Sequence, residues 1–263
     1  MYLRVLIENT AYTPALCTEH GLSLYLETNG KRILFDCGQS DAFSRNAALL
    51  GIHVSSIDLC ILSHGHYDHG GGIHTFLSQN SHAPVYIRRD AFGRHFSGTE
   101  KEIGIDPSLK NHPQIILTED ETILSPHLRL LTLNGEKALY PLSNENMLRM
   151  ENGQLTEDRF LHEQYLLIEE AGKRILISGC SHKGVLNLMH WLRPDVLIGG
   201  FHWKSRATKG ESGFSLLREA DMLARFPARF YTCHCTGENI YAFIEPRFKG
   251  RIGYLSCGCE LTL

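Results

Sequence analysis

Residues 61–72, with the sequence ILSHGHYDHGGG, constrain this chain more than any other stretch. A short apolar run leads directly into His64, His66, Asp68 and His69, all within six positions, and three glycines follow. Desolvating imidazole and carboxylate groups at the end of a buried strand costs free energy unless something binds them there. The stretch therefore predicts a strand that ends at a binding site.

The runs before and after this stretch predict alternating strands and helices. We expect strands over 3–9, 22–30, 31–38, 57–63 and 83–89, with Asn29-Gly30 as a hairpin signal, and helices over 41–51 and 72–80. From residue 164 we expect strands over 164–172, 173–179, 194–202, 228–235 and 252–263, and helices over 183–193, 212–226 and 238–248. This order predicts an α/β fold with helix-covered sheets, and we expect a single domain over residues 1–263.

Residues 90–160 have a weaker pattern than the rest of the chain. Two strand-like runs, 114–120 and 128–133, stand among Pro, His, Asn and charged residues. The irregular residues 140–160 are interpreted as an active-site lid or a dimer contact, and a homo-oligomer is one possible assembly.

Length, charge and cysteine content narrow the class of protein. The chain has 263 residues, of which 43% are hydrophobic and 21% are charged, as in one globular domain. A net charge of −3 argues against a nucleic-acid or anionic-membrane partner. We find neither a signal peptide nor a run of 18 apolar residues, so we expect a cytoplasmic protein whose eight cysteines are reduced thiols.

The spacing of the histidine cluster suits metal binding. His64 and His66 can point the same way from an extended segment, and a turn through Tyr67 can present Asp68 and His69 to a neighbouring point. One short segment could thus contribute to two metal positions, which need further ligands. Four more histidines adjoin strand-like runs and are candidates: His162, His182, His202 and His234.

The motif SHGHYDH resembles the His-x-His-x-Asp-His signature of the metallo-β-lactamase superfamily. The run ILFDCG resembles the strand of that superfamily that ends in Asp-x-Gly, here Asp36 and Gly38. Five runs (EHGLSLYLE, SHGHYDHGGG, LISGCSHKGVLN, IGGFH and HCTG) are together similar to one branch. Its named members are the 7,8-dihydropterin-6-methyl-4-(β-D-ribofuranosyl)-aminobenzene-5′-phosphate synthases.

The resemblance implies a fold and a set of ligands. The fold is an αββα sandwich, in which two mixed β-sheets are covered by helices on their outer faces. One set of residues would hold a first metal ion: His64, His66 and His162. A second set would hold a second ion: Asp68, His69 and His234. The ions would be divalent, with zinc the first candidate and manganese or iron as alternatives.

One position departs from the superfamily pattern. The carboxylate that bridges the two metals follows a glycine in the wider superfamily, but this chain reads ISGCSH, with Cys180 at that position and His182 two residues on. Either His182 replaces a ligand or Cys180 binds as a thiolate. Because imidazole cannot bridge two ions and thiolate is softer than carboxylate, we expect His182 to be a ligand, solvent to bridge, and Cys180 to pack beside the metals.

Several other residues are assigned roles by their neighbourhood in the sequence. We expect Asp68 to orient the attacking water, His202 to meet charge in the transition state, and His202 and Trp203 to line the substrate pocket. Glu19 and His20 either approach this pocket or cap a turn. We expect Cys233 and Cys235 to pack on the opposite face from His234, and Cys257 and Cys259 to be structural.

Two classes of function fit these features. The first is a cytoplasmic metal-dependent hydrolase or hydrolase-like synthase that acts on a phosphorylated or ester-type small molecule, such as the pterin-linked phosphate of the synthase branch. The second is a metal-stabilised binding or regulatory protein with a vestigial pocket. Turnover of a generic phosphodiester that is abolished by a chelator separates the two.

Overall fold

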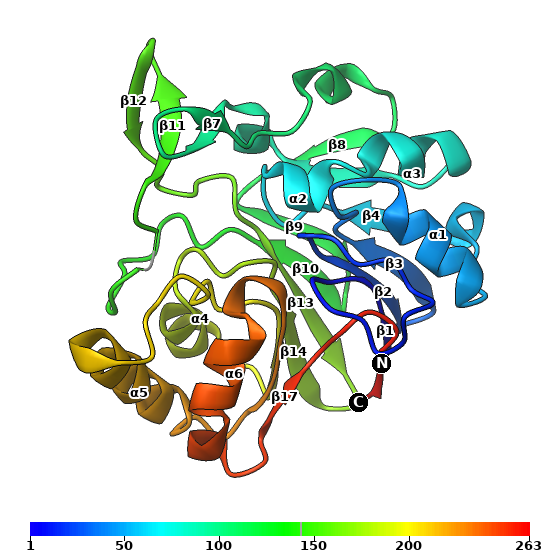
Figure 1. Ribbon diagram of the computed structural model, residues 1–263. Coiled ribbons are helices and arrows are strands. Elements are labelled where there is room, and N and C mark those ends of the chain that lie inside the picture. Colours follow the sequence, from blue (N-terminus) through cyan, green and yellow to red (C-terminus); the bar gives the residue numbers. More distant parts are fainter. Residues whose placement is uncertain (143) are drawn as a thin grey trace.

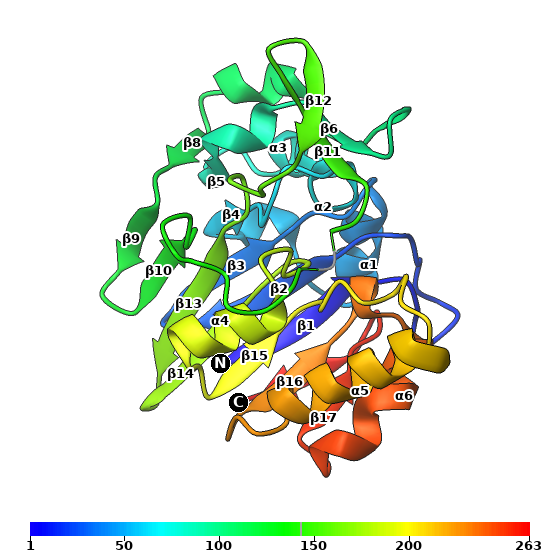
Figure 2. The same cartoon turned by 90° about the vertical axis from the view of Figure 1, so that its left-hand side faces the viewer.

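The computed structural model describes residues 1–142 and 144–263 and has two large sheets packed face to face (Figures 1 and 2). The first is seven-stranded, with the order β18-β1-β2-β3-β4-β5-β8. Its strands are β1 (Tyr2–Ile7), β2 (Ser23–Thr28), β3 (Lys31–Phe35), β4 (Leu59–Ile61), β5 (Val85–Arg88), β8 (Ile115–Thr118) and β18 (Glu260–Thr262). The predicted hairpin joins β2 to β3, with Asn29 and Gly30 both at positive φ as a type I′ turn requires.

The second sheet is also seven-stranded, with the order β17-β16-β15-β14-β13-β10-β9. Its strands are β9 (Glu121–Ser125), β10 (Leu128–Leu131), β13 (Tyr165–Glu170), β14 (Lys173–Ile177), β15 (Val196–Ile198), β16 (Arg229–Thr232) and β17 (Ile252–Tyr254). Strands β14 to β17 run parallel to one another, as do β3, β4, β5 and β8 of the first sheet. Both sheets are therefore mixed.

Helices cover the outer face of each sheet, which confirms the predicted αββα sandwich (Figure 1). The first sheet carries α1 (Ala42–Leu49), α2 (Tyr67–Gly70) and α3 (Ile73–Gln79), and the second carries α4 (Val185–Leu192), α5 (Gly210–Leu223) and α6 (Glu238–Ile244). Short 3₁₀ turns lie between these elements at η1 (Val54–Ser56), η2 (Arg89–Phe92), η3 (Pro107–Asn111), η4 (His234–Thr236) and η5 (Glu245–Phe248). None of the described helices is long and apolar enough to cross a membrane.

Aliphatic side chains from both sheets interdigitate in the centre of the sandwich. The core there includes Val5, Leu24 and Ile33 from the first sheet and Leu166 and Ile177 from the second, all at most 1% exposed. Burial of this apolar surface is the main term that holds the sheets together. Two further clusters pack α1 and α3 on the first sheet and α4, α5 and α6 on the second.

The structure corrects the sequence interpretation in three places. Residues 252–263 form two strands rather than one, since β17 pairs with β16 in the second sheet and β18 pairs with β1 in the first. The strand expected over 228–235 ends at Thr232. Residues 140–160 contain a regular hairpin of β11 (Met147–Glu151) and β12 (Gln154–Glu157), although residue 143 lies outside the described residues.

That hairpin belongs to a small third sheet at one end of the sandwich (Figure 1). Its order is β12-β11-β6-β7, where β6 is His95–Ser97 and β7 is Lys101–Glu102. An isolated bridge between His66 and Gly104 ties this region to the histidine cluster. The small sheet is thereby placed beside the candidate site.

Candidate metal centre

The candidate ligands come from loops at the carboxyl ends of strands in both large sheets. β4 leads into His64, β14 into Cys180 and His182, β15 into His202, and β16 into His234. Because β14, β15 and β16 are parallel, their carboxyl ends meet at one edge, and β4 of the facing sheet ends at the same place. Open α/β sheets commonly bind ligands at such an edge.

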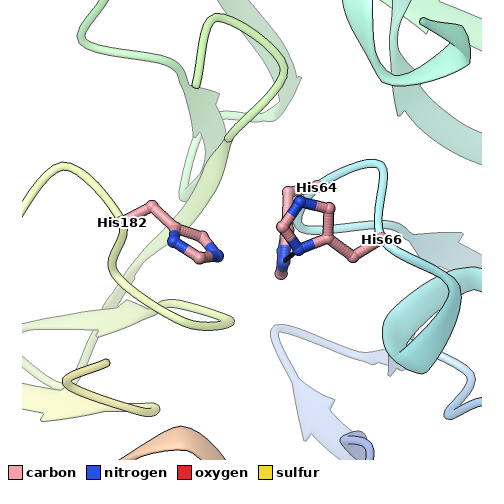
Figure 3. Close-up of side chains that lie close together, drawn as sticks. All are labelled: His64, His66 and His182. Carbon is pink, nitrogen blue, oxygen red and sulfur yellow. Dashed lines mark hydrogen bonds between the residues drawn. The ribbon is translucent and has the colours of Figure 1, made fainter. Parts of the chain in front are cut away.

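A first group consists of His64, His66 and His182 (Figure 3). Nε2 of His64 lies 3.1 Å from Nδ1 of His66, and one nitrogen of each of the three rings falls within 4.8 Å of the others. His182 directs Nδ1 to the side-chain oxygen of Asn144 at 3.0 Å, while its buried Nε2 has no hydrogen-bond partner. Burial lowers the pKa of all three imidazoles well below the usual value, so neutral rings face one another.

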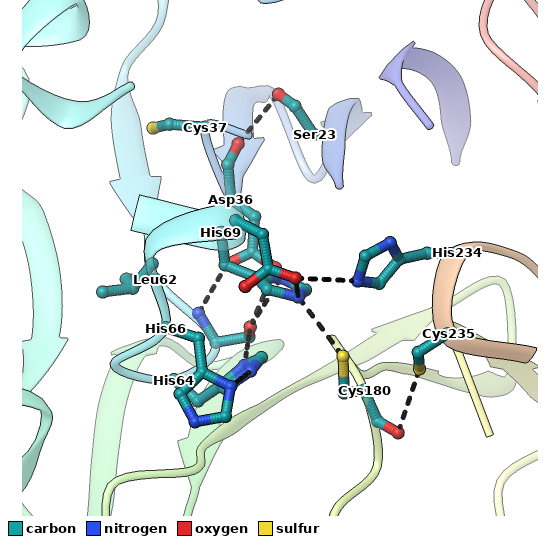
Figure 4. A network of polar contacts seen from close by, with 12 residues as sticks. Ser23, Asp36, Cys37, Leu62, His64, His66, His69, Cys180, His234 and Cys235 are labelled. Carbon is teal, nitrogen blue, oxygen red and sulfur yellow. Dashed lines mark hydrogen bonds and ion pairs between the residues drawn. The ribbon is translucent and has the colours of Figure 1, made fainter. Parts of the chain in front are cut away.

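A second group gathers around the carboxylate of Asp68, and Figure 4 shows two of its histidines, His69 and His234. Oδ2 of Asp68 lies 3.3 Å from Nε2 of His234, 3.8 Å from Nε2 of His69 and 3.3 Å from Nε2 of His20. Burial would raise the pKa of Asp68, but the neighbouring His69 and His234 hold it well below its usual range. Asp68 is therefore an ionised carboxylate among imidazoles.

Asp36 holds His69 in the orientation that this group needs. Its carboxylate lies 2.7 Å from Nδ1 of His69, and it accepts hydrogen bonds from the amide and the hydroxyl of Ser63. Burial would lower the pKa of His69, but Asp36 and Asp68 raise it to about 9. Since Nδ1 faces Asp36, Nε2 of His69 is the nitrogen that faces the site, as in carboxylate-supported metal ligands.

Cys180 lies between the two groups. Its Sγ is 3.2 Å from Nε2 of His69, and it shares a possible ligand set with His64 and His69. The side chain is 3% exposed, and burial raises the pKa of the thiol well above its usual value. Cys180 is thus next to the site, as the departure from the superfamily motif led us to expect.

His162 forms a possible ligand group with Asp158 and with His66, one of the two residues that the resemblance placed beside it. Its Nδ1 accepts a hydrogen bond from the amide of Gly65 at 2.9 Å, and its Nε2 lies 3.2 Å from Oδ2 of Asp158. The third place beside His64 and His66 belongs instead to His182. Asp158 was missed from the sequence, although its spacing of four residues from His162 was a usable signal.

A cleft of about 530 Å³ opens over both groups. His182, His202 and His234 line it from the large sheets, and Lys101 and Met147 line it from the small sheet. His202 therefore lies at the pocket, as predicted. The lid interpretation of residues 140–160 fits this position, because β11 begins at the wall of the cleft.

Trp203 corrects a prediction. It is 3% exposed, packs edge-on against Phe201 in the core under α4 and α5, and does not line the cleft. Aromatic rings of this size bury much apolar surface, so Trp203 stabilises the fold, and it lines a smaller pocket that shares His202 with the cleft.

Of Glu19 and His20, one caps a turn and the other approaches the pocket. The carboxylate of Glu19 accepts hydrogen bonds from the amides of Gln39 and Ser40, which caps the turn after β3. His20 lines the cleft beside Asp68.

The cysteines of the β16 loop behave differently from each other. Cys233 packs between the sheets, as predicted, but Cys235 lines the cleft. The expectation for Cys235 fails because the strand alternation stops at Thr232 and His234 takes a positive φ of 49°. Cys257 is structural, since its sulfur accepts a hydrogen bond from the backbone amide of Glu8 at 2.9 Å. All eight cysteines are free thiols among the described residues.

The donor set fits divalent transition-metal ions. Nε2 of His182 is buried without a hydrogen-bond partner, which is unfavourable unless a ligand occupies the space in front of it, and Nε2 of His234 faces only the carboxylate of Asp68 at 3.3 Å. Imidazole nitrogens together with a carboxylate are ligands that suit zinc, manganese and iron. The same atoms have no evident structural use.

Comparisons with known proteins agree with this geometry. The family model of the metallo-beta-lactamase superfamily matches residues 18–136. The crystal structure of Tm1679, a metal-dependent hydrolase of the β-lactamase superfamily, matches with a TM-score of 0.84 and 26% identity over 100% of this chain and 99% of that one. The chain thus has the fold of a solved member of this superfamily, and its residues 18–136 match the model of the metallo-beta-lactamase superfamily.

Two archaeal relatives from Methanocaldococcus jannaschii match most of this metallo-β-lactamase-fold chain. The uncharacterized protein MJ0448 is 29% identical over 244 residues, which cover 89% of this chain and 90% of that protein. The 7,8-dihydropterin-6-methyl-4-(beta-D-ribofuranosyl)-aminobenzene-5'-phosphate synthase is 29% identical over 276 residues, which cover 94% and 91%. The resemblance to the synthase branch is therefore a similarity along nearly the whole chain.

Proposed function

We propose that this protein is a cytoplasmic, single-domain metal-dependent hydrolase or hydrolase-like synthase that acts on a phosphorylated or ester-type small molecule. The observation that carries the proposal is the convergence of two adjoining donor groups, whose buried imidazole nitrogens include the unpartnered Nε2 of His182, at the base of one cleft. A purely structural role leaves those nitrogens without purpose.

Each donor group would hold one ion, with zinc the first candidate and manganese or iron as alternatives. The first site would use His64, His66 and His182, and the second would use Asp68, His69 and His234. Bound divalent ions lower the pKa of a water molecule and polarise the oxygen of the substrate under attack. Cys180 stands at the position that the bridging carboxylate has in the wider superfamily. We expect this cysteine to pack beside the site without ligating.

The chain's own residues supply orientation and electrostatics. Asp68 is ionised and accepts hydrogen bonds, so its carboxylate can orient the attacking water toward the cleft. His202 faces the same cleft from the β15 loop, with its ring centroid 4.2 Å from that of His182. From there His202 can donate a hydrogen bond to negative charge that develops on the substrate.

The lining of the cleft favours an anionic substrate. Lys101 of β7 and Lys204 of the β15 loop bring two ammonium groups to the cleft, with Ser97 and Asn146 as polar neighbours. Glu145 and the ionised Asp68 are acidic groups that line the same cleft. An ammonium group binds a phosphate oxygen by a charge-assisted hydrogen bond, so these lysines are suited to a phosphorylated small molecule.

The Lys101→Gln variant is expected to raise KM about tenfold for a phosphorylated substrate, because one charge-assisted hydrogen bond contributes about 1.5 kcal/mol. Its kcat should change little, because the ammonium of Lys101 contacts the hydroxyl of Tyr67 at 3.3 Å and no residue of either donor group. The control is Lys110→Gln, an exposed lysine in η3. An equal rise of KM for an uncharged ester in the Lys101→Gln variant contradicts a phosphate-binding role.

The experiment that tests the proposal is a hydrolysis screen of the metal-loaded protein. Bis-p-nitrophenyl phosphate, phosphomonoesters, cyclic nucleotides and lactones are offered in parallel, with and without chelator. We expect turnover of at least one class that is lost on chelation and restored by added zinc or manganese. A protein that binds metal firmly but turns over none of them supports the alternative, a metal-stabilised binding protein.

A further inference from the structure

Residues 158–164, with the sequence DRFLHEQ, lie between β12 and β13 and contact both loops that carry the first donor group. The amide of Gln164 donates to the carbonyl of Ser63 at 2.8 Å, beside His64. The carboxylate of Glu163 accepts a hydrogen bond from the backbone amide of His182 at 2.7 Å. We call residues 158–164 the clamp segment.

His162 forms the central contact of the clamp segment. The amide of Gly65 donates to Nδ1 of His162 at 2.9 Å, and Gly65 is the residue between His64 and His66. The opposite face of Gly65 is also fixed, because a Cβ added there would collide with the backbone of Ala91. The peptide that joins two candidate ligands is therefore held from both sides.

The hydrogen bond to Gly65 determines which nitrogen of His162 carries the proton. A nitrogen that accepts from an amide has no hydrogen of its own, so the neutral ring must be protonated at Nε2. That Nε2 faces Oδ2 of Asp158 at 3.2 Å, as a donor to a carboxylate. His162 forms a possible ligand group with His66 and Asp158, but in this tautomer Nδ1 accepts from Gly65 and Nε2 carries the proton, so neither nitrogen has a free lone pair for a metal ion.

Asp158 is held in turn by its neighbours. Its Oδ2 lies 2.7 Å from Nδ1 of the buried His95, and its Oδ1 accepts a hydrogen bond from the backbone amide of Phe160 at 2.8 Å. Asp158, His95 and His162 are all at most 3% exposed. This carboxylate is therefore committed to orienting two imidazoles.

The same segment also fixes the third donor of the first group. The ring of Phe160 stacks on that of His182 at 3.9 Å with an angle of 10° between the planes. Together with the bond from Glu163 to the amide of His182, this stacking leaves Nε2 of His182 aimed at His64 and His66. One seven-residue segment thereby sets the geometry of all three donors.

We propose that His162 is a positioning residue that holds the Gly65 peptide between His64 and His66, and that it does not ligate a metal ion in this chain. The inference rests on the proposed function, because it concerns how a metal at the first donor group is held. It assigns the clamp segment the task of pre-organising that group. Substitution of a residue that supports metal ligands typically lowers metal affinity about 10- to 100-fold.

Two substitutions at one position separate the roles. In His162→Asn the side-chain oxygen takes the place of Nδ1 and can still accept from Gly65, whereas in His162→Gln the amide reaches only the place of Nε2. We expect His162→Asn to keep both metal equivalents with near-normal affinity, and His162→Gln to bind the first metal about 10- to 100-fold more weakly. If Nε2 of His162 ligated the metal, His162→Asn would bind the first metal more weakly than His162→Gln. That result overturns the proposal.

A measurement on the wild-type protein decides the matter even where a variant fails to fold. Long-range ¹H–¹⁵N correlation spectra of the zinc-loaded protein, with His162 assigned through its contact with the Gly65 amide, report the protonated nitrogen. We expect the Nε2-protonated ring; protonation at Nδ1 with Nε2 bound to zinc overturns the proposal. Zinc titration of the same sample distinguishes this outcome from failure of the proposed function, in which no zinc binds.

Discussion

Changing Asp68 to Ala is expected to lower kcat by roughly two to four orders of magnitude while the protein remains folded. The carboxylate is the acceptor around which His20, His69 and His234 gather, and it is the group placed to orient the attacking water. The fold should tolerate the change, because the Asp68 side chain contacts the imidazoles of the site and no part of the core between the sheets.

Steady-state kinetics, metal analysis and circular dichroism of the Asp68→Ala variant check this expectation. Asp41→Ala is the matched control, since Asp41 is an exposed carboxylate before α1 whose ion pair with Arg45 is also exposed. A surface pair of this kind contributes at most about 1 kcal/mol. If Asp68→Ala kept most of its turnover with full metal content, Asp68 would not be the residue that orients the water.

The second large effect is a contrast between His182 and Cys180. His182→Ala should weaken the first metal by more than about a hundredfold, beyond what loss of a supporting residue usually causes. Its Nε2 is buried and unpartnered beside His64 and His66, so it has no other evident purpose. Cys180→Ala should keep both metal equivalents, because we expect Cys180 to pack beside the site, where its Sγ lies 3.2 Å from Nε2 of His69, and not to ligate.

Metal content and turnover of the two variants, purified side by side, test this contrast. Asn144→Ala is a useful third variant, because the side-chain oxygen of Asn144 contacts Nδ1 of His182. We expect this variant to lose less of the same metal than His182→Ala. Loss of one metal equivalent from Cys180→Ala, with His182→Ala unaffected, reverses the assignment and makes Cys180 a thiolate ligand.

The sequence predicted the site where local spacing controls geometry. His64 and His66 stand two apart on an extended segment and His69 follows in the first turn of α2, so their approach depends on few residues. The strand-end positions of His182, His202 and His234 follow from parallel pairing of β14, β15 and β16. Alternating strands and helices likewise predicted the sandwich.

The sequence could not show the contacts that depend on distant residues. His162 precedes a strand as a superfamily ligand would, but its hydrogen bond to Gly65 spans 97 positions and cannot be inferred from spacing. Cys235 was placed by strand alternation, which fails because β16 ends three residues earlier. The small sheet was missed because its strands are short and polar, and β11 pairs with β6 only through the tertiary fold.

Metal analysis of the purified protein tests the central claim most directly. We expect close to two equivalents of zinc, manganese or iron per chain after reconstitution, because the two donor groups together offer more ligands than one tetrahedral site can use. Removing both equivalents with chelator should abolish turnover, and adding metal back should restore it. A folded protein that hydrolyses a substrate with no transition metal bound contradicts the account.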